Sequence, residues 1–271
     1  MFPDLIDIGF LHLKTYGACM AVGFILCWHL IERLSGRKDL SNLLLSLMVS
    51  GIVGSRAAYV IEHWSAEFAM HPERIVRVDQ GGLMFYGGLI LAIAVFFAWC
   101  ALKKERALPI ADLLCTAIPL GHAFGRVGCF FYGCCYGKIS ASPLAVTFPS
   151  HSPAWYEQLH DGLVTAASPR SLPVLPTQLF EAAALLALFA ALMLLYRRAS
   201  AAGARRRDGL LTGCYLVGYA LIRFAMEFLR GDPRAAVGPF SISQTISIGM
   251  VVLGSAFLVY SRRGENGRQT N

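Results

Sequence analysis

The segment 125–138 combines one arginine, three thiols and several glycines, directly after a long apolar stretch. The arginine is Arg126, the thiols are Cys129, Cys134 and Cys135, and the glycines are Gly125, Gly128, Gly133 and Gly137. An arginine at the edge of a bilayer is costly, so it marks a functional candidate. Glycines let a backbone approach a ligand or another helix closely. The segment therefore predicts a site for an anionic group that arrives from the lipid.

Further ionisable residues lie inside other apolar stretches. Arg223 and Glu227 are four residues apart, so they share one face of a helix. Arg230 follows one turn later, and Glu181 opens a different stretch. Guanidinium groups bind phosphate through a bidentate fork, so an excess of arginines, with Arg126 among them, favours a phosphate site. The alternative for each carboxylate is a purely structural ion pair.

Other candidate residues lie at a similar depth, at the ends of the apolar stretches. They are Tyr16 at the first stretch, Tyr86, Gly87 and Gly88 at the third, and Gln178 beside Glu181. Arg56 lies nearer the middle of the second stretch. We expect it to be a structural donor between helices.

Seven apolar stretches must position these residues, at about 15–33, 42–62, 82–101, 111–131, 176–196, 209–229 and 240–260. A stretch of about 20 apolar residues is long enough to cross a bilayer. The 271-residue chain is 56% hydrophobic and 15% charged, whereas soluble domains have about 25% charged residues. The sequence predicts an all-α polytopic membrane protein with seven transmembrane helices, in which residues 1–271 form a single integral membrane domain.

The basic residues predict the orientation of this chain. Of its 24 lysines and arginines, 14 fall in the loops after stretches one, three, five and seven, 7 fall on the other side and 3 lie inside stretches. Cytoplasmic loops carry the excess of Lys and Arg, so the N-terminus is predicted outside and the C-terminus in the cytoplasm. The candidate site then faces the extracytoplasmic side of the membrane. The net charge of +7 reflects this topology, and no nucleic-acid partner is predicted.

The segment 132–175 falls outside in this topology and is too long for a simple connection. Loops of such length are usually functional or disordered. Trp155, Tyr156 and Leu159 indicate a short amphipathic helix on the outer membrane surface. The alternative is a mobile linker.

The chain has eight cysteines, and five of them lie in apolar stretches where thiols pack as small hydrophobes. The cluster of Cys129, Cys134 and Cys135 lies near the outer face, where disulfides form and persist. Four interpretations remain open: a structural disulfide, a metal site that includes His122, catalytic thiols, and unpaired packing. The first is preferred, because the spacing matches no standard zinc pattern.

Motifs along most of the chain resemble those of the bacterial prolipoprotein diacylglyceryl transferase family. Residues 125–137 resemble its Gly-Arg-x-Gly-Asn-Phe-x-Asn-x-Glu-x-x-Gly pattern, and 223–230 match its late Arg/Glu pattern. The shorter similarities are 16–17 to Tyr-Gly, 54–59 to Gly-x-Arg-x-x-Tyr, 82–88 to Gly-Met-Ser-Phe-His-Gly-Gly, 176–181 to Pro-Ser-Gln-Leu-Tyr-Glu and 243–244 to Gly-Gln. Seven spans with the N-terminus outside is also the topology of that family.

The resemblance implies a reaction and roles for the candidate residues. The family moves a diacylglyceryl group from the membrane lipid phosphatidylglycerol to the lipobox cysteine in the signal peptide of an exported prolipoprotein, and releases glycerol 1-phosphate. It implies no cofactor, and no metal site is predicted. The implied catalytic residues are Arg126, Arg223, Glu227, Tyr86 and Tyr16. The implied substrate-binding residues are Gly87, Gly88, Gly125, Cys129, Cys134, Gly137, Gln178, Glu181 and Arg230.

Four positions depart from the family pattern. Tyr86 stands where the family has histidine, Cys129 and Tyr132 replace asparagines, and Cys134 replaces a glutamate. A tyrosine with its ordinary pKa of about 10 is a poor base. The alternatives to the transferase are therefore a paralogue that acts on another lipid or acceptor, and a non-enzymatic or thiol-redox membrane protein on the same scaffold.

Overall fold

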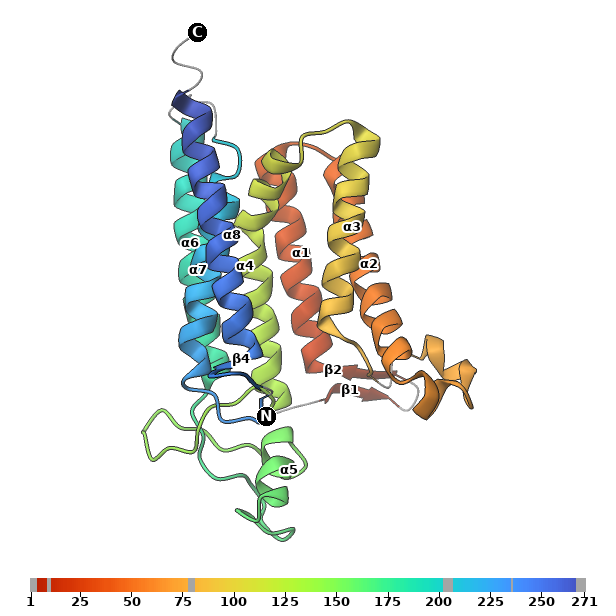
Figure 1. Ribbon diagram of the computed structural model, residues 1–271. Helices are drawn as coiled ribbons and strands as arrows, with labels where there is room; N and C mark the ends of the chain where they lie inside the picture. Colours follow the sequence, from red (N-terminus) through yellow and green to blue (C-terminus); the bar gives the residue numbers. More distant parts are fainter. Residues whose placement is uncertain (1–3, 9–10, 78–80, 202–206, 235, 267–271) are drawn as a thin grey trace. The chain divides into compact units, whose positions relative to one another are not determined.

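The computed structural model describes residues 4–8, 11–77, 81–201, 207–234 and 236–266 (Figure 1). Its helices are α1 (Thr15–Ser35), α2 (Asp39–Glu62), α3 (Phe85–Lys103), α4 (Ala107–Tyr132), α5 (Pro153–His160), α6 (Thr177–Ala201), α7 (Leu210–Glu227) and α8 (Ile242–Asn266). A π-helical turn (Trp64–Phe68) and a 3-10 turn (Pro72–Val76) lie between α2 and α3. The strands are β1 (Asp4–Ile8), β2 (Leu11–Lys14), β3 (Ala236–Val237) and β4 (Phe240–Ser241).

Seven of these helices, all but α5, are long and apolar enough to cross a membrane. This confirms the seven predicted spans, and their bounds differ from the sequence estimate by a few residues. The all-α prediction missed two small antiparallel sheets, β1 with β2 and β3 with β4. The strands are two to five residues long and follow no sustained hydrophobic alternation, so the sequence offered little signal for them.

The chain divides into two compact units, residues 1–30 with 108–271, and residues 31–107. In the first unit, α4 is the most buried of the seven spans. It packs closely against α1, because a Cβ added to Gly23 would lie 2.9 Å from the Cβ of Phe124 and 3.1 Å from the carbonyl oxygen of Gly121. Helices α7 and α8 meet in the same way at Gly213 and Gly254. Small residues allow such close helix packing in membranes.

A buried carboxylate fixes the start of α7 in this unit. Asp112 on α4 is 1% exposed and accepts hydrogen bonds from the backbone N–H groups of Gly209 and Thr212, both at 2.8 Å, and from the Thr212 hydroxyl at 2.7 Å. The first N–H groups of a helix have no partner within the helix, so the carboxylate supplies one from a neighbouring helix. The sequence analysis missed this role, because nothing in the spacing of Asp112 and Thr212 announces it.

The five long helices of the first unit place one set of ends together. The start of α1, the end of α4, the start of α6, the end of α7 and the start of α8 lie at the same end of this unit, next to the segment that carries α5 (Figure 1). Helix α5 confirms the short helix predicted around Trp155 and Tyr156, and the mobile-linker alternative is not needed. Trp155 is buried and its indole N–H donates to the carbonyl of Ser168 at 2.9 Å.

The second unit contains α2, α3 and the turns between them. The two helices touch through glycines, because a Cβ added to Gly54 would lie 2.6 Å from the carbonyl oxygen of Gly87. Ion pairs of Arg37, with Asp39 at 2.6 Å and with Glu105 at 2.7 Å, link the beginning and the end of the unit. The close contact at Gly54 and Gly87 therefore fixes the distance between α2 and α3.

Candidate functional site

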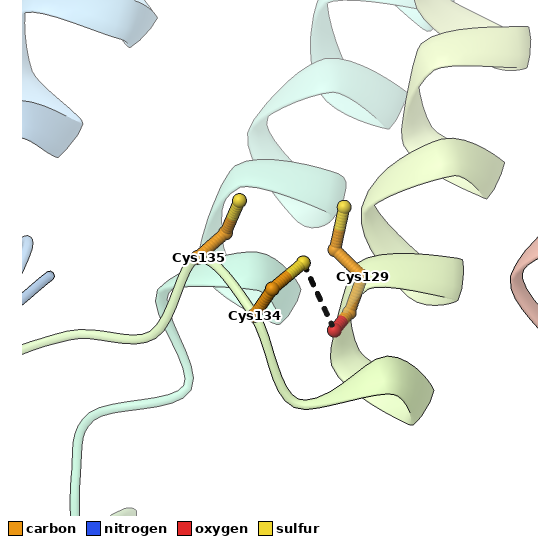
Figure 2. A group of neighbouring side chains, drawn as sticks. All are labelled: Cys129, Cys134 and Cys135. Atoms are coloured by element: carbon orange, nitrogen blue, oxygen red, sulfur yellow. Dashed lines mark hydrogen bonds between the residues drawn. The ribbon is translucent and has the colours of Figure 1, made fainter. Parts of the chain in front are cut away.

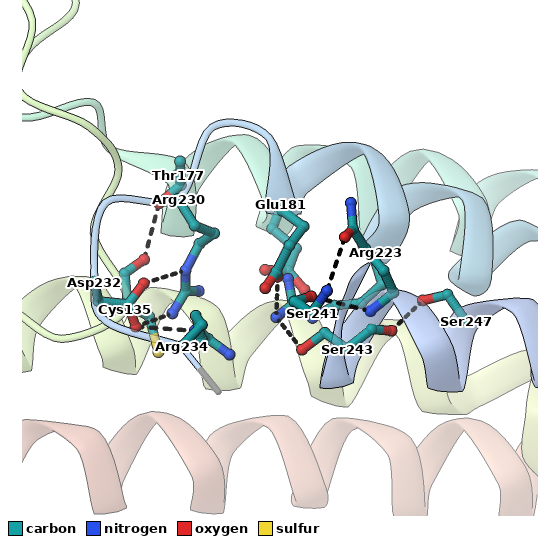
Figure 3. Close-up of polar contacts among 12 residues, drawn as sticks. Cys135, Thr177, Glu181, Arg223, Arg230, Asp232, Arg234, Ser241, Ser243 and Ser247 are labelled. Atoms are coloured by element: carbon teal, nitrogen blue, oxygen red, sulfur yellow. Dashed lines mark hydrogen bonds and ion pairs between the residues drawn. The ribbon is translucent and has the colours of Figure 1, made fainter. Parts of the chain in front are cut away.

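Charged side chains of α6, of α7 and of the segment after α7 gather with serines from the start of α8 at the shared end of the first unit (Figure 3). Arg126 of α4 pairs with Glu181 of α6, with Nη2 and Oε1 at 3.0 Å. The side chain of Glu181 is 1% exposed and that of Arg126 is 14% exposed. A buried carboxylate is stabilised only if a partner compensates its charge, so the pair holds α4 and α6 together.

The second pair lies within α7. Arg223 binds Glu227 one turn later, with Nη2 and Oε2 at 2.8 Å, and the side chains are 9% and 7% exposed. Arg223 also donates from Nη2 to the hydroxyl of Ser243 at 2.9 Å, which ties α7 to the first turn of α8. That turn is itself fixed by a capping box, in which Ser241 and Gln244 exchange backbone and side-chain hydrogen bonds.

Asp232 supplies a third carboxylate that the sequence analysis missed. It accepts a bidentate pair from Arg230, Nε to Oδ1 and Nη2 to Oδ2 at 2.7 Å each, and Arg234 reaches it at 3.1 Å (Figure 3). These hydrogen bonds raise the pKa of Arg230 against the opposing effect of its burial. The expectation of too few carboxylate partners for the arginines is therefore wrong, since each of the three predicted arginines has one.

Two guanidinium N–H groups nevertheless keep no partner. Arg126 Nε and Arg223 Nη1 are buried and make no hydrogen bond to any residue in the described ranges. Tyr219 and His122 lie close to both arginines, so the two groups belong to one cluster. A buried donor without an acceptor is costly. The pair of free donors marks the place where an anionic oxygen would be held.

The thiol-bearing loop after α4 is fixed by the start of α6. The hydroxyl of Thr177 donates to the carbonyl of Cys135 at 2.8 Å, and the amide of Gln178 donates to the carbonyl of Cys134 at 2.7 Å. Gln178 is fully buried. The side chain of Gln178 therefore has a structural role, because its amide group already holds the loop. Its substrate contact stays a prediction.

Gly137 has a steric role in the same loop. A Cβ added there would lie 2.8 Å from the Leu175 carbonyl oxygen and 2.8 Å from that of Leu229. The backbone N–H of Gly137 donates to the first of these carbonyls at 2.8 Å. Only a residue without a side chain fits between the entry to α6 and the exit from α7.

The thiol of Cys129, on the last turn of α4, lies close to the thiols of Cys134 and Cys135 on the loop (Figure 2). The sulfur atoms of Cys129, Cys134 and Cys135 are all within 4.8 Å of one another, and all eight cysteines of the chain are free in the structure. A structural disulfide in this cluster, the interpretation preferred from the sequence, is therefore not present. His122 is not part of the cluster and contacts the ring of Tyr219 instead, at 5.1 Å between centroids.

The two loop thiols differ in acidity. The hydrogen-bonding contacts with the thiols of Cys129 and Cys134 hold the pKa of Cys135 below its ordinary value, and the cation of Arg230 acts in the same direction. The contacts with Cys129 and Cys135, together with burial, raise the pKa of Cys134. A thiolate in this cluster is thus expected at Cys135 first.

Tyr16 and Gly125 join the site from the contact between α1 and α4. Tyr16 is 41% exposed at the start of α1, and Gly128 faces its ring, because an added Cβ would lie 3.0 Å from Tyr16 Cδ2. A Cβ on Gly125 would meet only the flexible Met20 side chain, at 3.1 Å from Sδ. Close approach therefore requires a glycine more strictly at 128 than at 125.

Tyr86, Gly87, Gly88 and Arg56 belong to the second unit. Tyr86 is 48% exposed at the start of α3. Arg56 is a structural donor as expected, but it donates to no membrane-spanning helix. Its acceptors are carbonyls of the 3-10 turn, Ile75 at 2.8 Å and Arg74, and of the segment before α3, Gly81 at 3.0 Å and Gly82 at 3.1 Å. Gly88 faces Ser55 of α2 as Gly87 faces Gly54. The structure thus gives both glycines a packing role, and their substrate contacts stay predictions.

Comparison with known proteins adds the family. A family model described as prolipoprotein diacylglyceryl transferase matches residues 3–260. The chain is 32% identical over 266 residues to phosphatidylglycerol–prolipoprotein diacylglyceryl transferase 2 of Clostridium perfringens, with 96% of this chain and 94% of that protein covered. It is 29% identical over 278 residues to the corresponding transferase of Geobacter sulfurreducens (98% and 97% covered), and 30% identical over 275 residues to that of Vibrio cholerae (97% and 92% covered).

Proposed function

The chain belongs to the prolipoprotein diacylglyceryl transferase family, and from this premise we propose that it transfers a diacylglyceryl group from phosphatidylglycerol to a prolipoprotein. The acceptor is the thiol of the lipobox cysteine in the signal peptide, and the second product is glycerol 1-phosphate. In this reaction a C–S bond forms at the glyceryl carbon and the C–O bond to the phosphate breaks. The thiol proton leaves before or during the attack, and the electron pair of the broken bond stays on the phosphate.

The observation that carries the proposal is the pair of free, buried guanidinium donors. Within the described part of the chain, Arg126 Nε and Arg223 Nη1 have no hydrogen-bond partner, although each arginine already binds one carboxylate. An incoming lipid phosphate would satisfy both donors. Donors that are fixed in advance in a water-poor site stabilise the charge that develops on a leaving phosphate. Arg126 and Arg223 therefore hold and stabilise the departing group, with Arg230 at the rim.

The acceptor thiol must lose its proton, because the thiolate is the nucleophile. We assign Glu227, Tyr16 and Tyr86 to the positioning and deprotonation of this thiol. Glu227 Oε1 is buried and without a hydrogen-bond partner among the residues that the structure covers. In the first unit, the other proposed substrate contacts are Gly125, Cys129, Cys134, Gly137, Gln178 and Glu181. Gly87 and Gly88 stay predicted substrate contacts.

The protein is a multi-pass membrane protein with seven apolar helices. We place it in the bacterial inner membrane with the N-terminus outside, the C-terminus in the cytoplasm and the site on the extracytoplasmic side. The bias of Lys and Arg among the loops supports this orientation. Residues 1–271 then act as one integral membrane domain, with 132–175 outside.

Transfer in vesicles tests the proposal. The purified chain is mixed with vesicles that contain phosphatidylglycerol and with a peptide that carries a lipobox cysteine, and the modified peptide and glycerol phosphate are quantified. We expect equal amounts of both products, and no transfer from vesicles of phosphatidylethanolamine alone. Arg198→Ala is the matched control, because Arg198 is exposed near the end of α6.

A second candidate is a paralogue that acts on another lipid or acceptor, or a thiol-redox membrane protein. The observation that favours it is the free thiol cluster, which stands where the family carries Asn and Glu. Transfer from phosphatidylethanolamine, or to a peptide without a lipobox, would favour the paralogue. Absence of transfer together with reversible oxidation of the thiols would favour the redox protein.

A further inference from the structure

The thiol cluster brings three possible sulfur ligands together, which the proposed substrate contacts of Cys129 and Cys134 do not by themselves require. The sulfurs of Cys129, Cys134 and Cys135 lie within 4.8 Å of one another. Figure 2 shows that Cys129 points from the last turn of α4 toward the two loop thiols. Three sulfurs that each lie about 2.3 Å from one ion, in a trigonal plane, are about 4.0 Å apart. The cluster fits this spacing within a small side-chain adjustment.

The loop holds the sulfurs in place without the help of a metal. The N–H groups of Gly133 and Cys134 donate to the carbonyl of Cys129, at 2.9 and 3.2 Å. Gly133 has a φ of 82° and Cys135 one of 63°, so the chain turns sharply on both sides of Cys134. The hydrogen bonds from Thr177 and Gln178 then fix the carbonyls of both loop cysteines. A site formed in advance loses little conformational entropy when an ion enters.

The donor set selects the ion. Among the described residues, no histidine, aspartate, glutamate or fourth cysteine joins the three sulfurs in a mutually close ligand group. Structural zinc sites are almost always four-coordinate and tetrahedral. Soft thiolate ligands suit Cu(I), which is stable with three ligands in a plane. A trio of thiols without a fourth protein ligand therefore favours Cu(I) over Zn²⁺.

Two cations beside the cluster compensate its charge. Three thiolates and one Cu(I) carry two net negative charges, and Arg126 and Arg230 both lie near Cys135. Buried charges are tolerated when opposite charges lie close to them. Each of these arginines also binds a carboxylate, Glu181 in the case of Arg126 and Asp232 in the case of Arg230.

We propose that Cys129, Cys134 and Cys135 form a trigonal thiolate site that binds one Cu(I) ion per chain. Binding exchanges three S–H protons for three S–Cu bonds, the protons go to solvent, and no atom changes oxidation state. The site does not depend on the transferase assignment.

Copper binding to the reduced full-length chain in detergent tests the proposal. Cu(I) is supplied without oxygen as its complex with a chromogenic chelator, and its transfer to the protein is followed by the loss of chelator colour. We expect one Cu(I) per chain, and about 100-fold or greater weakening in each of Cys129→Ser, Cys134→Ser and Cys135→Ser, since even the loss of groups that only orient a metal ligand costs 10–100-fold. Cys214→Ser on α7 is the matched control and should bind as the parent does.

X-ray absorption of the copper-loaded parent chain needs no variant, so its result does not depend on whether a variant folds. Three sulfur neighbours at about 2.3 Å support the site, and two sulfurs, or any nitrogen neighbour, overturn it. Equal binding by the parent chain and the three cluster variants also overturns it. So does zinc that displaces Cu(I) at equal concentration, because the donor set would then not select copper.

Discussion

Arg126 is both half of a buried ion pair and a proposed phosphate ligand, and a pair of variants separates the two roles. In Arg126→Ala the carboxylate of Glu181, 1% exposed, loses its 3.0 Å partner. Breaking a buried pair in this way costs about 3–5 kcal/mol, because an uncompensated charge stays behind. Arg126→Ala combined with Glu181→Ala removes both charges. It should recover about 0.5–3 kcal/mol of the loss, the range found for residues in direct contact.

The assay measures stability and activity on the same samples. Thermal unfolding of the parent, both single variants and the double variant in one detergent gives the coupling energy, and transfer from phosphatidylglycerol vesicles gives the activity. We expect partial recovery of stability in the double variant and no recovery of transfer, since the free Nε donor is absent from it. Transfer near the parent rate in the double variant would refute the phosphate role. Additive stability losses would refute the coupled buried pair.

Three further predictions concern the frame of the site and its orientation. Asp112→Ala leaves two N–H groups and a hydroxyl at the start of α7 without their acceptor, so thermal unfolding should report a loss of about 2–5 kcal/mol, whereas Asp112→Asn should lose less. Gly137→Ala forces its Cβ into two carbonyl oxygens at 2.8 Å and should reduce the folded yield, while Gly125→Ala, which meets only Met20, should not. Cysteines introduced for the exposed Ala166 and Ser200 should react with an impermeant thiol reagent on intact cells at 166 only, and the opposite pattern would reverse the proposed topology.

The predicted spans were accurate because the signal for them is local. An apolar stretch long enough to cross a bilayer is visible in any window of the sequence, and so are arginines placed within it. The pair of Arg223 and Glu227 was visible for the same reason, since residues four apart on a helix are neighbours. The short helix of residues 153–160 followed from Trp155 and Tyr156 in a polar loop.

The partners of the other arginines were not visible. Asp232 lies only two residues after Arg230, but a separation of two in a segment without helical or strand periodicity does not predict the bidentate contact seen in the structure. Asp112 is a single charge in an apolar stretch, and its partners are about a hundred residues away along the chain. The expected disulfide failed in a related way, since thiols close in sequence suggested a bond whereas the structure shows a three-membered cluster.

The sequence by itself determined the membrane class, the seven spans, the family resemblance and which residue types could do chemistry, because each of these depends on composition or on short spacing. Only the tertiary structure decided which donors remain free. Whether Arg126 Nε and Arg223 Nη1 have partners depends on how α4, α6, α7 and α8 pack at one end of the first unit. Gly137 likewise depends on the approach of two distant carbonyls. Such contacts join segments far apart in the chain, and no local pattern of residues records them.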